Sequence, residues 1–204
     1  MHSTNADKII DAAVVLFRQK NFYDVSVSEI CKAAKVSRSA FYGTFPDKKA
    51  ILLRLLTLAA RDTEDLLQEI ITAPNDFERI WSLSLRYIRL AEYLGPVLAG
   101  TALCMELQEP FGIMERVNAH NEWLATLMRN AQANGVIRCR LQPETMIPII
   151  NSLMMQTLFE WCCCGGTFSL QSRARGYQEV ILDVAPECRT VATDEKEQNR
   201  TSGN

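Results

Sequence analysis

An all-α protein is the fold class that the sequence predicts, with a three-helix N-terminal domain, a larger helical domain after it, and about nine helices in total. Apolar residues recur every three or four positions through most of the 204 residues, which is the spacing of one helix face. Ser26 is followed three residues later by Glu29, the pattern of a capping box at a helix start. No stretch alternates apolar and polar residues as a half-buried strand does, so we expect no sheet.

The N-terminal domain is expected to begin with a helix over about 5–20 that has one apolar face. A second helix starts at Ser26 and is interrupted near Lys35, and Ser37 is a suitable cap for a third. The residues that share the inner faces of the first and third helices are Ile9, Ala12, Ala13, Leu16 and Phe17, and then Phe41 and Phe45.

The outer face of the third helix is small, polar and cationic. At about 100° per residue, Arg38, Ser39, Tyr42 and Gly43 lie opposite Phe41. Two short helices joined by a tight turn, the second with such an outer face, predict a helix-turn-helix at 26–45. The second helix of this motif can enter a DNA major groove.

Residues from about 6 to 52 resemble the DNA-binding domain of the tetracycline-repressor (TetR) family of transcription regulators. The matching segments are IIDAAVVLF at 9–17, KNFYDVSV at 20–27, EICKAAKVS at 29–37 and FYGTFPDK at 41–48. The match covers about a quarter of the chain, and its motifs are specific.

Three positions depart from the usual pattern of that family. Asn21 and Lys35 stand where the family usually has glycine. Asparagine tolerates the left-handed conformation, and Lys35 is a candidate for an extra phosphate contact. Gly43 stands where a larger side chain is common, so this helix is expected to contact fewer bases than its relatives do.

The resemblance implies a dimeric transcription regulator, most simply a repressor, that binds a palindromic operator in double-stranded DNA and is released by a small-molecule effector. The domains are then a DNA-binding domain at 3–63, an effector-binding and dimerisation domain at 64–185, and a polar, disordered tail at 186–204. Tyr42 and Lys48 are expected to hold phosphates, and Arg38 and Ser39 to contact base edges. The residues expected at the DNA are Lys35, Ser37, Arg38, Ser39, Ala40, Tyr42, Gly43, Thr44 and Lys48.

Charge is distributed as expected for a nucleic-acid-binding head on an acidic body. The net charge is −2, but residues 1–61 carry +5 and residues 62–204 carry −7. No apolar run approaches the ~20 residues that span a bilayer, and the N-terminal residues lack an apolar signal region. We therefore expect a cytoplasmic protein without a membrane partner.

The remaining helices are expected to connect the N-terminal domain to the larger domain, through the first of them, and to build the larger domain. Pro148 lies inside one of them and should kink or delay it. The expected helices cover 47–71, 75–94, 96–107, 110–134, 143–164 and 170–184.

Aromatic and methionine residues of this domain are candidates for a ligand cavity. Most are expected in the core, but relatives in the family line a cavity with such residues, and methionine suits a permissive apolar pocket. The candidates are Trp81, Tyr87, Met105, Met114, Trp123, Met128, Met155 and Phe159. The last two helices are the expected dimer surface, through Leu153, Leu158, Trp161, Tyr177, Val180 and Ile181.

Catalysis and metal binding find little support. With two histidines, no nucleophile motif and no phosphate or dinucleotide loop, we expect no enzyme, no catalytic residue and no cofactor. Cys162, Cys163 and Cys164 point ~100° apart on a helix and cannot converge on one ion, so they are expected to be buried and to bind no metal. Cys139 lies between two arginines whose charges favour a thiolate. A thiol-sensing regulator without a small-molecule ligand is therefore the alternative, and an enzyme or scaffold on the helical body is a more remote one.

Overall fold

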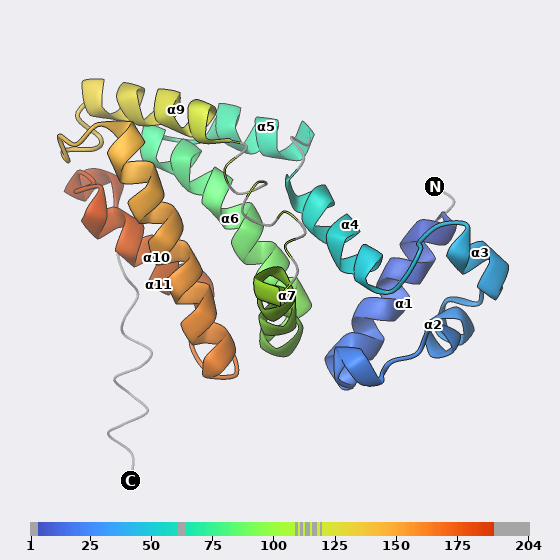
Figure 1. The fold of residues 1–204 in the computed structure, drawn as a ribbon. Coiled ribbons are helices and arrows are strands. Elements are labelled where there is room, and N and C mark those ends of the chain that lie inside the picture. The colour runs from blue at the N-terminus through green and yellow to red at the C-terminus, as the bar shows by residue number, and fades with distance from the viewer. Residues whose placement is uncertain are drawn as a thin grey trace, which may run out of the picture.

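The chain forms a small helical head joined to a larger helical body, as a computed structural model shows (Figure 1). The structure describes residues 4–60, 64–108, 110, 112, 115, 118 and 120–189. The candidate pocket residue Met114 lies outside these residues. Within them the protein is all-α, as predicted, and the only pairing of strand type is one antiparallel bridge between Ile137 and Val184.

The head consists of α1 (Asn5–Gln19), the 3-10 turn η1 (Phe22–Asp24), α2 (Val27–Ala34) and α3 (Arg38–Tyr42). Its core is aromatic and aliphatic, and the rings of Phe17 and Phe22 lie 4.7 Å apart. Ile9, Ala13, Phe17 and Phe41 are all buried, so the predicted inner faces of α1 and α3 are confirmed.

The connection from head to body is made of two helices rather than the single one expected over 47–71. α4 (Lys49–Ala60) leaves the head, and α5 (Glu64–Thr72) runs in a different direction along the body (Figure 1). The apolar spacing alone could not show this, because both helices have apolar faces and the change of direction depends on what each packs against. α5 packs on α6.

The body is built around α6 (Asp76–Leu94), which contacts α4, α5, α7, α9 and α11. Asn75 caps it at the predicted start of this helix, and Phe77, Leu83 and Ile88 are buried on more than one of its sides. Gly95, at a φ of 77°, ends α6, and α7 (Pro96–Gln108) follows at an angle of 111°. Among the described residues no single helix is long and apolar enough to cross a membrane, although the bent pair α6–α7 together has the required length and composition.

The remaining helices are α9 (Asn121–Ala133), α10 (Pro143–Cys163) and α11 (Leu170–Ile181). α10 continues through Pro148, so the expected delay at that residue does not occur. α10 and α11 pack side by side (Figure 1). They are joined by a turn in which Gly166 has a φ of 75° and lies against Trp161 and Pro96.

The described chain is ordered beyond the predicted start of the tail at 186. Pro186–Cys188 form the 3-10 turn η2, and the Nε of Arg189 donates to the carbonyl oxygen of Val184 over 2.7 Å. The prediction of disorder is wrong for these residues, because the backbone of Val184 and Ala185 pairs with the segment after α9. The rest of the predicted tail lies outside the described residues.

Candidate nucleic-acid interface and effector cavity

The helix-turn-helix begins with the capping box that the sequence predicts. Ser26 Oγ accepts a hydrogen bond from the Glu29 amide over 3.2 Å, and Glu29 Oε2 accepts from the Ser26 amide over 2.9 Å. Lys20 Nζ lies 2.7 Å from Glu29 Oε1. The bond from Lys20, together with those from Ser26, lowers the pKa of Glu29 to about 2. The start of α2 is therefore bonded to the end of α1.

Helix α3 presents the face that the sequence assigns to DNA. Ser37 Oγ accepts from the amide of Ala40 over 3.0 Å and caps the helix. Phe41 and Phe45 are buried with their rings 6.2 Å apart, which turns the opposite face outward. The exposed residues of this face are Arg38, Ser39, Tyr42, Gly43 and Thr44, whereas Ala40 is half-buried.

Lys35 ends α2 in the left-handed conformation, with a φ of 55°. This conformation costs a non-glycine residue roughly 1–2 kcal/mol, and the side chain of Lys35 is exposed. Asn21 does not use its tolerance of that conformation. Its φ is −59°, and its side chain accepts from the Tyr23 amide over 3.0 Å to cap η1.

Lys48 points back into the head. Its Nζ donates to the carbonyl oxygens of Phe22 (2.7 Å), Tyr23 (3.1 Å) and Val25 (2.9 Å), and lies 4.7 Å from the centre of the Phe22 ring. An ammonium group has three hydrogens, so these carbonyls account for all of them. Burial lowers the pKa of Lys48, and the charge of Asp24 opposes this less strongly. A phosphate contact by Lys48 requires one of these bonds to be given up.

The body contains two adjoining cavities. The inner cavity, of about 90 Å³, lies between α6, α9 and α10 and is largely apolar, through residues such as Leu83, Ile88 and Leu124. The outer cavity, of about 870 Å³, is more open and lies between α7 and α10. Both are lined by Asn121, Asn151 and Met155, so they meet at these residues.

One side of the inner cavity is polar. Arg86 Nη2 lies 2.8 Å from His120 Nδ1 and donates to the hydroxyl of Tyr87 over 3.1 Å. Ser84 also lines this cavity and accepts from Gln178 Nε2 over 2.8 Å. A ligand here would meet an apolar surface with a few fixed polar groups, the usual composition of a small-molecule site.

The predicted pocket residues are divided between these cavities and the core. Tyr87 and Met155 line the inner cavity, and Phe159 lines the outer one. Trp81 and Met128 are almost fully buried in the core and line neither, Met105 lines a separate hollow beside α4, and Trp123 packs near His120. Sequence reasoning missed Ser84, Asn121 and Asn151, because polar residues on amphipathic helices are usually solvated.

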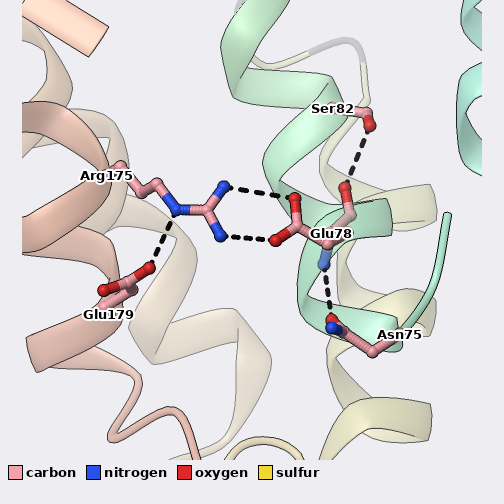
Figure 2. Close-up of polar contacts among 5 residues, drawn as sticks. All are labelled: Asn75, Glu78, Ser82, Arg175 and Glu179. Carbon is pink, nitrogen blue, oxygen red and sulfur yellow. Dashed lines mark hydrogen bonds and ion pairs between the residues drawn. The ribbon is translucent and has the colours of Figure 1, made fainter. Parts of the chain in front are cut away.

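The start of α6 is tied to α11 by an ion-pair cluster (Figure 2). Arg175 Nη1 donates to Glu78 Oε2 over 3.1 Å, Nη2 donates to Glu78 Oε1, and Nε donates to Glu179 Oε1 over 2.8 Å. Only 14% of the Arg175 side chain is exposed. Burial lowers the pKa of Arg175, but its bonds to Glu78 and Glu179 outweigh this and raise it overall. The cluster therefore holds the helix that lines the inner cavity against α11.

The cysteines differ in their exposure to solvent. Cys163 and Cys164 are exposed, which contradicts the prediction that the run 162–164 is buried, because α10 turns these two positions outward. Burial, with smaller contributions from Cys163 and Cys104, raises the pKa of Cys162 to about 11, away from the thiolate form that reacts. Cys139 is half-buried. Within the described residues no His, Cys, Asp and Glu side chains cluster as metal ligands.

The predicted dimer residues differ in exposure. Val180 is 74% exposed and Tyr177 is 41% exposed, both on α11. Trp161 is buried and donates from its Nε1 to the Phe168 carbonyl over 3.1 Å, so it is used within the chain. Leu153, Leu158 and Ile181 are half-buried, and Leu158 lines the inner cavity.

The protein is therefore a two-domain helix-turn-helix protein. Its three-helix head exposes one face of the motif, and its helical body contains a cavity. Residues 9–55 match the sequence pattern of the bacterial regulatory proteins of the tetR family. The match is confined to the N-terminal domain, so the head of this protein is similar to the DNA-binding domain of that family.

Curated relatives match this chain in the same region. It is 50% identical over 48 residues to the HTH-type transcriptional regulator YuxN of Bacillus subtilis, and 35% identical over 71 residues to the HTH-type transcriptional regulator EthR of Mycobacterium tuberculosis. These segments are 24% and 35% of this chain, and 16% and 33% of the two relatives.

Solved structures share the fold over most of the chain. The fatty acid degradation regulator FadR of Bacillus halodurans has a TM-score of 0.64 at 19% identity, covering 89% of this chain and 96% of its own. Thermus thermophilus FadR, a TetR-family repressor in complex with lauroyl-CoA, has a TM-score of 0.58 at 21% identity, covering 87% and 93%.

Proposed function

We propose that the protein is a transcriptional repressor that binds a palindromic operator as a homodimer and is released from it by a small-molecule effector. The observation that carries this proposal is the outward face of α3, with Arg38, Ser39 and Tyr42 exposed beside the buried Phe41. The named relatives are transcriptional regulators rather than enzymes, which supports a role in regulation. Such a protein acts in the cytoplasm, where bacterial DNA is.

At the DNA, Arg38 and Ser39 contact base edges in the major groove, and arginine favours guanine. Tyr42, Thr44, Ser37 and Lys35 contact phosphates, while Ala40 and Gly43 are small enough to let α3 approach the groove. Thr44 Oγ1 donates to the Ala40 carbonyl over 2.8 Å, so its hydroxyl hydrogen must turn toward DNA to contribute. Lys48 contributes mainly by holding the motif in shape, because its hydrogens are used by the head's own carbonyls.

One helix-turn-helix contacts too little DNA for strong selectivity, so two act together on half-sites about 34–36 Å apart or a multiple of that distance. The exposed Tyr177 and Val180 on α11, beside α10, are the surface through which two chains associate. Leu153, Leu158 and Ile181 are half-buried on the same two helices.

The effector acts through α4, which leads from Lys48 into the body and packs against α6. A ligand in the inner cavity contacts α6, and a shift of α6 changes the tilt of α4 and the separation of the two α3 helices. A ligand releases DNA only if it binds one arrangement better than the other, and a nearly complete switch needs ~5 kcal/mol of differential affinity. Thermus thermophilus FadR, which has a similar fold, was solved in complex with lauroyl-CoA, and this supports the proposal that the body binds a small molecule.

The proposal is tested by selecting duplexes from a random pool with the purified protein, and then measuring affinity for the selected site. We expect a palindrome. Arg38→Ala should relax discrimination at one position per half-site by about 1–3 kcal/mol, whereas Tyr42→Phe should weaken binding to all sequences alike. Arg140→Ala, an exposed arginine of the body, is the control and should change neither. Failure to enrich any duplex would overturn the proposal.

A further inference from the structure

Ser84 lies where the wall of the inner cavity meets α11. It is on α6 and lines the cavity together with Leu83, Ile88 and Met154. Its hydroxyl oxygen accepts a hydrogen bond from Nε2 of Gln178 over 2.8 Å. A serine side chain has no other polar atom, so the same hydroxyl both borders the cavity and contacts the helix behind it.

The hydrogen of that hydroxyl is left to donate elsewhere. Serine in a helix often donates to the carbonyl four residues earlier, and Ser82 does so, to the carbonyl of Glu78 over 2.9 Å. Ser84 makes no such bond among the residues that the structure describes. Because Gln178 occupies the oxygen as a donor, the hydrogen points away from Gln178. The Ser84 hydroxyl in the cavity wall is therefore a hydrogen-bond donor that Gln178, on the helix behind the wall, orients.

Gln178 is an unusual residue for its position. Its side chain is 1% exposed, and its Oε1 has no hydrogen-bond partner within the described part of the chain. Burying an unpaired amide oxygen is unfavourable, and a leucine of similar size would avoid this cost. A buried polar group that is only half satisfied calls for an explanation other than folding. Holding Ser84 for a ligand supplies that explanation.

We propose that the inner cavity binds an apolar group that carries a carbonyl oxygen, and that the Ser84 hydroxyl donates to this oxygen. Gln178 is the positioning residue, because it touches no ligand and acts through Ser84. Leu83, Ile88, Leu124 and Met154 cover the apolar part. Any further length of the ligand passes between Asn121 and Asn151 into the outer cavity. This inference rests on the ligand-responsive function proposed above, and it names the chemical class of the effector.

The test uses two small probes of nearly the same shape, cyclopentanone and methylenecyclopentane, which differ only in C=O against C=CH₂. Binding is followed without DNA, by NMR of protein labelled at the methionine methyl groups, because Met154 and Met155 line the inner cavity. The quantity compared is the ratio of the two dissociation constants in each variant. This ratio cancels the difference in how readily the two probes leave water.

Ser84→Ala should weaken the binding of cyclopentanone relative to that of methylenecyclopentane by about 3- to 10-fold, which is the effect of losing one hydrogen bond. Ser84→Thr keeps the hydroxyl and should restore the ratio. Gln178→Leu should also reduce the preference, because the freed Ser84 hydroxyl can then donate to the carbonyl of Ile80. Ser82→Ala is the matched control, since that hydroxyl already donates to Glu78, and it should leave the ratio unchanged.

An unchanged ratio in Ser84→Ala would overturn the inference, and so would the absence of any shift of the Met154 and Met155 methyl signals with either probe. Both outcomes are separate from the proposed function. If the same preparation selects a palindromic duplex, the proposed role as a regulator is supported although the effector class is rejected. If no duplex is selected but the preference for cyclopentanone is intact, the effector class is supported and the proposed role is rejected.

Discussion

The ammonium nitrogen of Lys48 lies 2.7 Å from the carbonyl oxygen of Phe22, and two neighbouring carbonyls take its other hydrogens. This contact closes the start of α4 onto the turn between α1 and α2. It therefore fixes the position of α3, the helix proposed to enter the major groove, between α2 and α4. The residue expected to bind a phosphate has a second task inside the protein.

Lys48→Met keeps the aliphatic stem and removes the three bonds. We expect the free energy of unfolding to fall by about 2–3 kcal/mol, since bonds from a charged donor are stronger than neutral ones. The slope of log affinity against log salt should stay the same, whereas loss of a phosphate contact reduces it by ~0.9. Urea denaturation and a salt series with operator DNA measure the two quantities. Unchanged stability with a smaller slope would show that Lys48 acts at the phosphate instead.

Lys35→Gly should raise the stability of the protein, whereas Lys48→Met lowers it. Glycine adopts a φ of 55° without strain, so the variant should be more stable by about 1 kcal/mol. If Lys35 contacts a phosphate, the salt slope should also fall by ~0.9. Lys35→Asn is the control for charge, because asparagine tolerates this conformation and carries none. An Asn variant that binds DNA like the wild type would exclude the phosphate contact.

Arg175→Ala leaves the half-buried carboxylate of Glu78 without the guanidinium that bonds both of its oxygens. We expect a loss of about 3–5 kcal/mol in the free energy of unfolding, because removing one partner leaves uncompensated charge. Arg175→Lys should recover only part of it, since lysine lacks the planar fork that bonds both oxygens of Glu78. Arg129→Ala, from an exposed pair with Glu144, should cost under ~1 kcal/mol. Denaturation at one fixed protein concentration compares all three.

Glu29 should make the stability of the head depend on pH in the acid range. Its pKa is about 2 in the folded protein and 4.5 ordinarily, so the native state favours the ionised form. The stability this supplies is present above pH 4.5 and is lost as the pH falls toward about 2. Glu29→Gln should therefore be less stable than the wild type at neutral pH, with the difference shrinking below 4.5. Denaturation at a series of pH values tests this, and a constant difference would contradict it.

Val180→Asp places a charge on the most exposed apolar residue of α11. A charge buried between two chains is costly, so we expect monomers by sedimentation and loss of operator binding. Val97→Asp is the matched control, a similarly exposed valine on α7, and it should leave the assembly intact. Monomeric wild-type protein at micromolar concentration would remove the basis of this prediction.

Interactions between residues close in sequence could be predicted without the structure. The caps formed by Ser26 with Glu29 and by Asn75 with Glu78 are three residues apart, and they lie where the sequence places them. The two faces of α3 also follow from helical geometry alone, because Phe41 and Phe45 share one side by spacing. Helix starts and the orientation of the recognition face are local properties, and local physical chemistry is sufficient for them.

The tertiary structure decided which polar side chains face solvent and which meet each other inside. Gln178 bonds to Ser84 across 94 positions and Arg175 bonds to Glu78 across 97, and no spacing rule connects such pairs. Lys48 illustrates the same point, because an exposed cation and one bonded to buried carbonyls look alike in a sequence. The cavity wall and the internal role of Lys48 depend on burial, and burial is set by how distant helices pack.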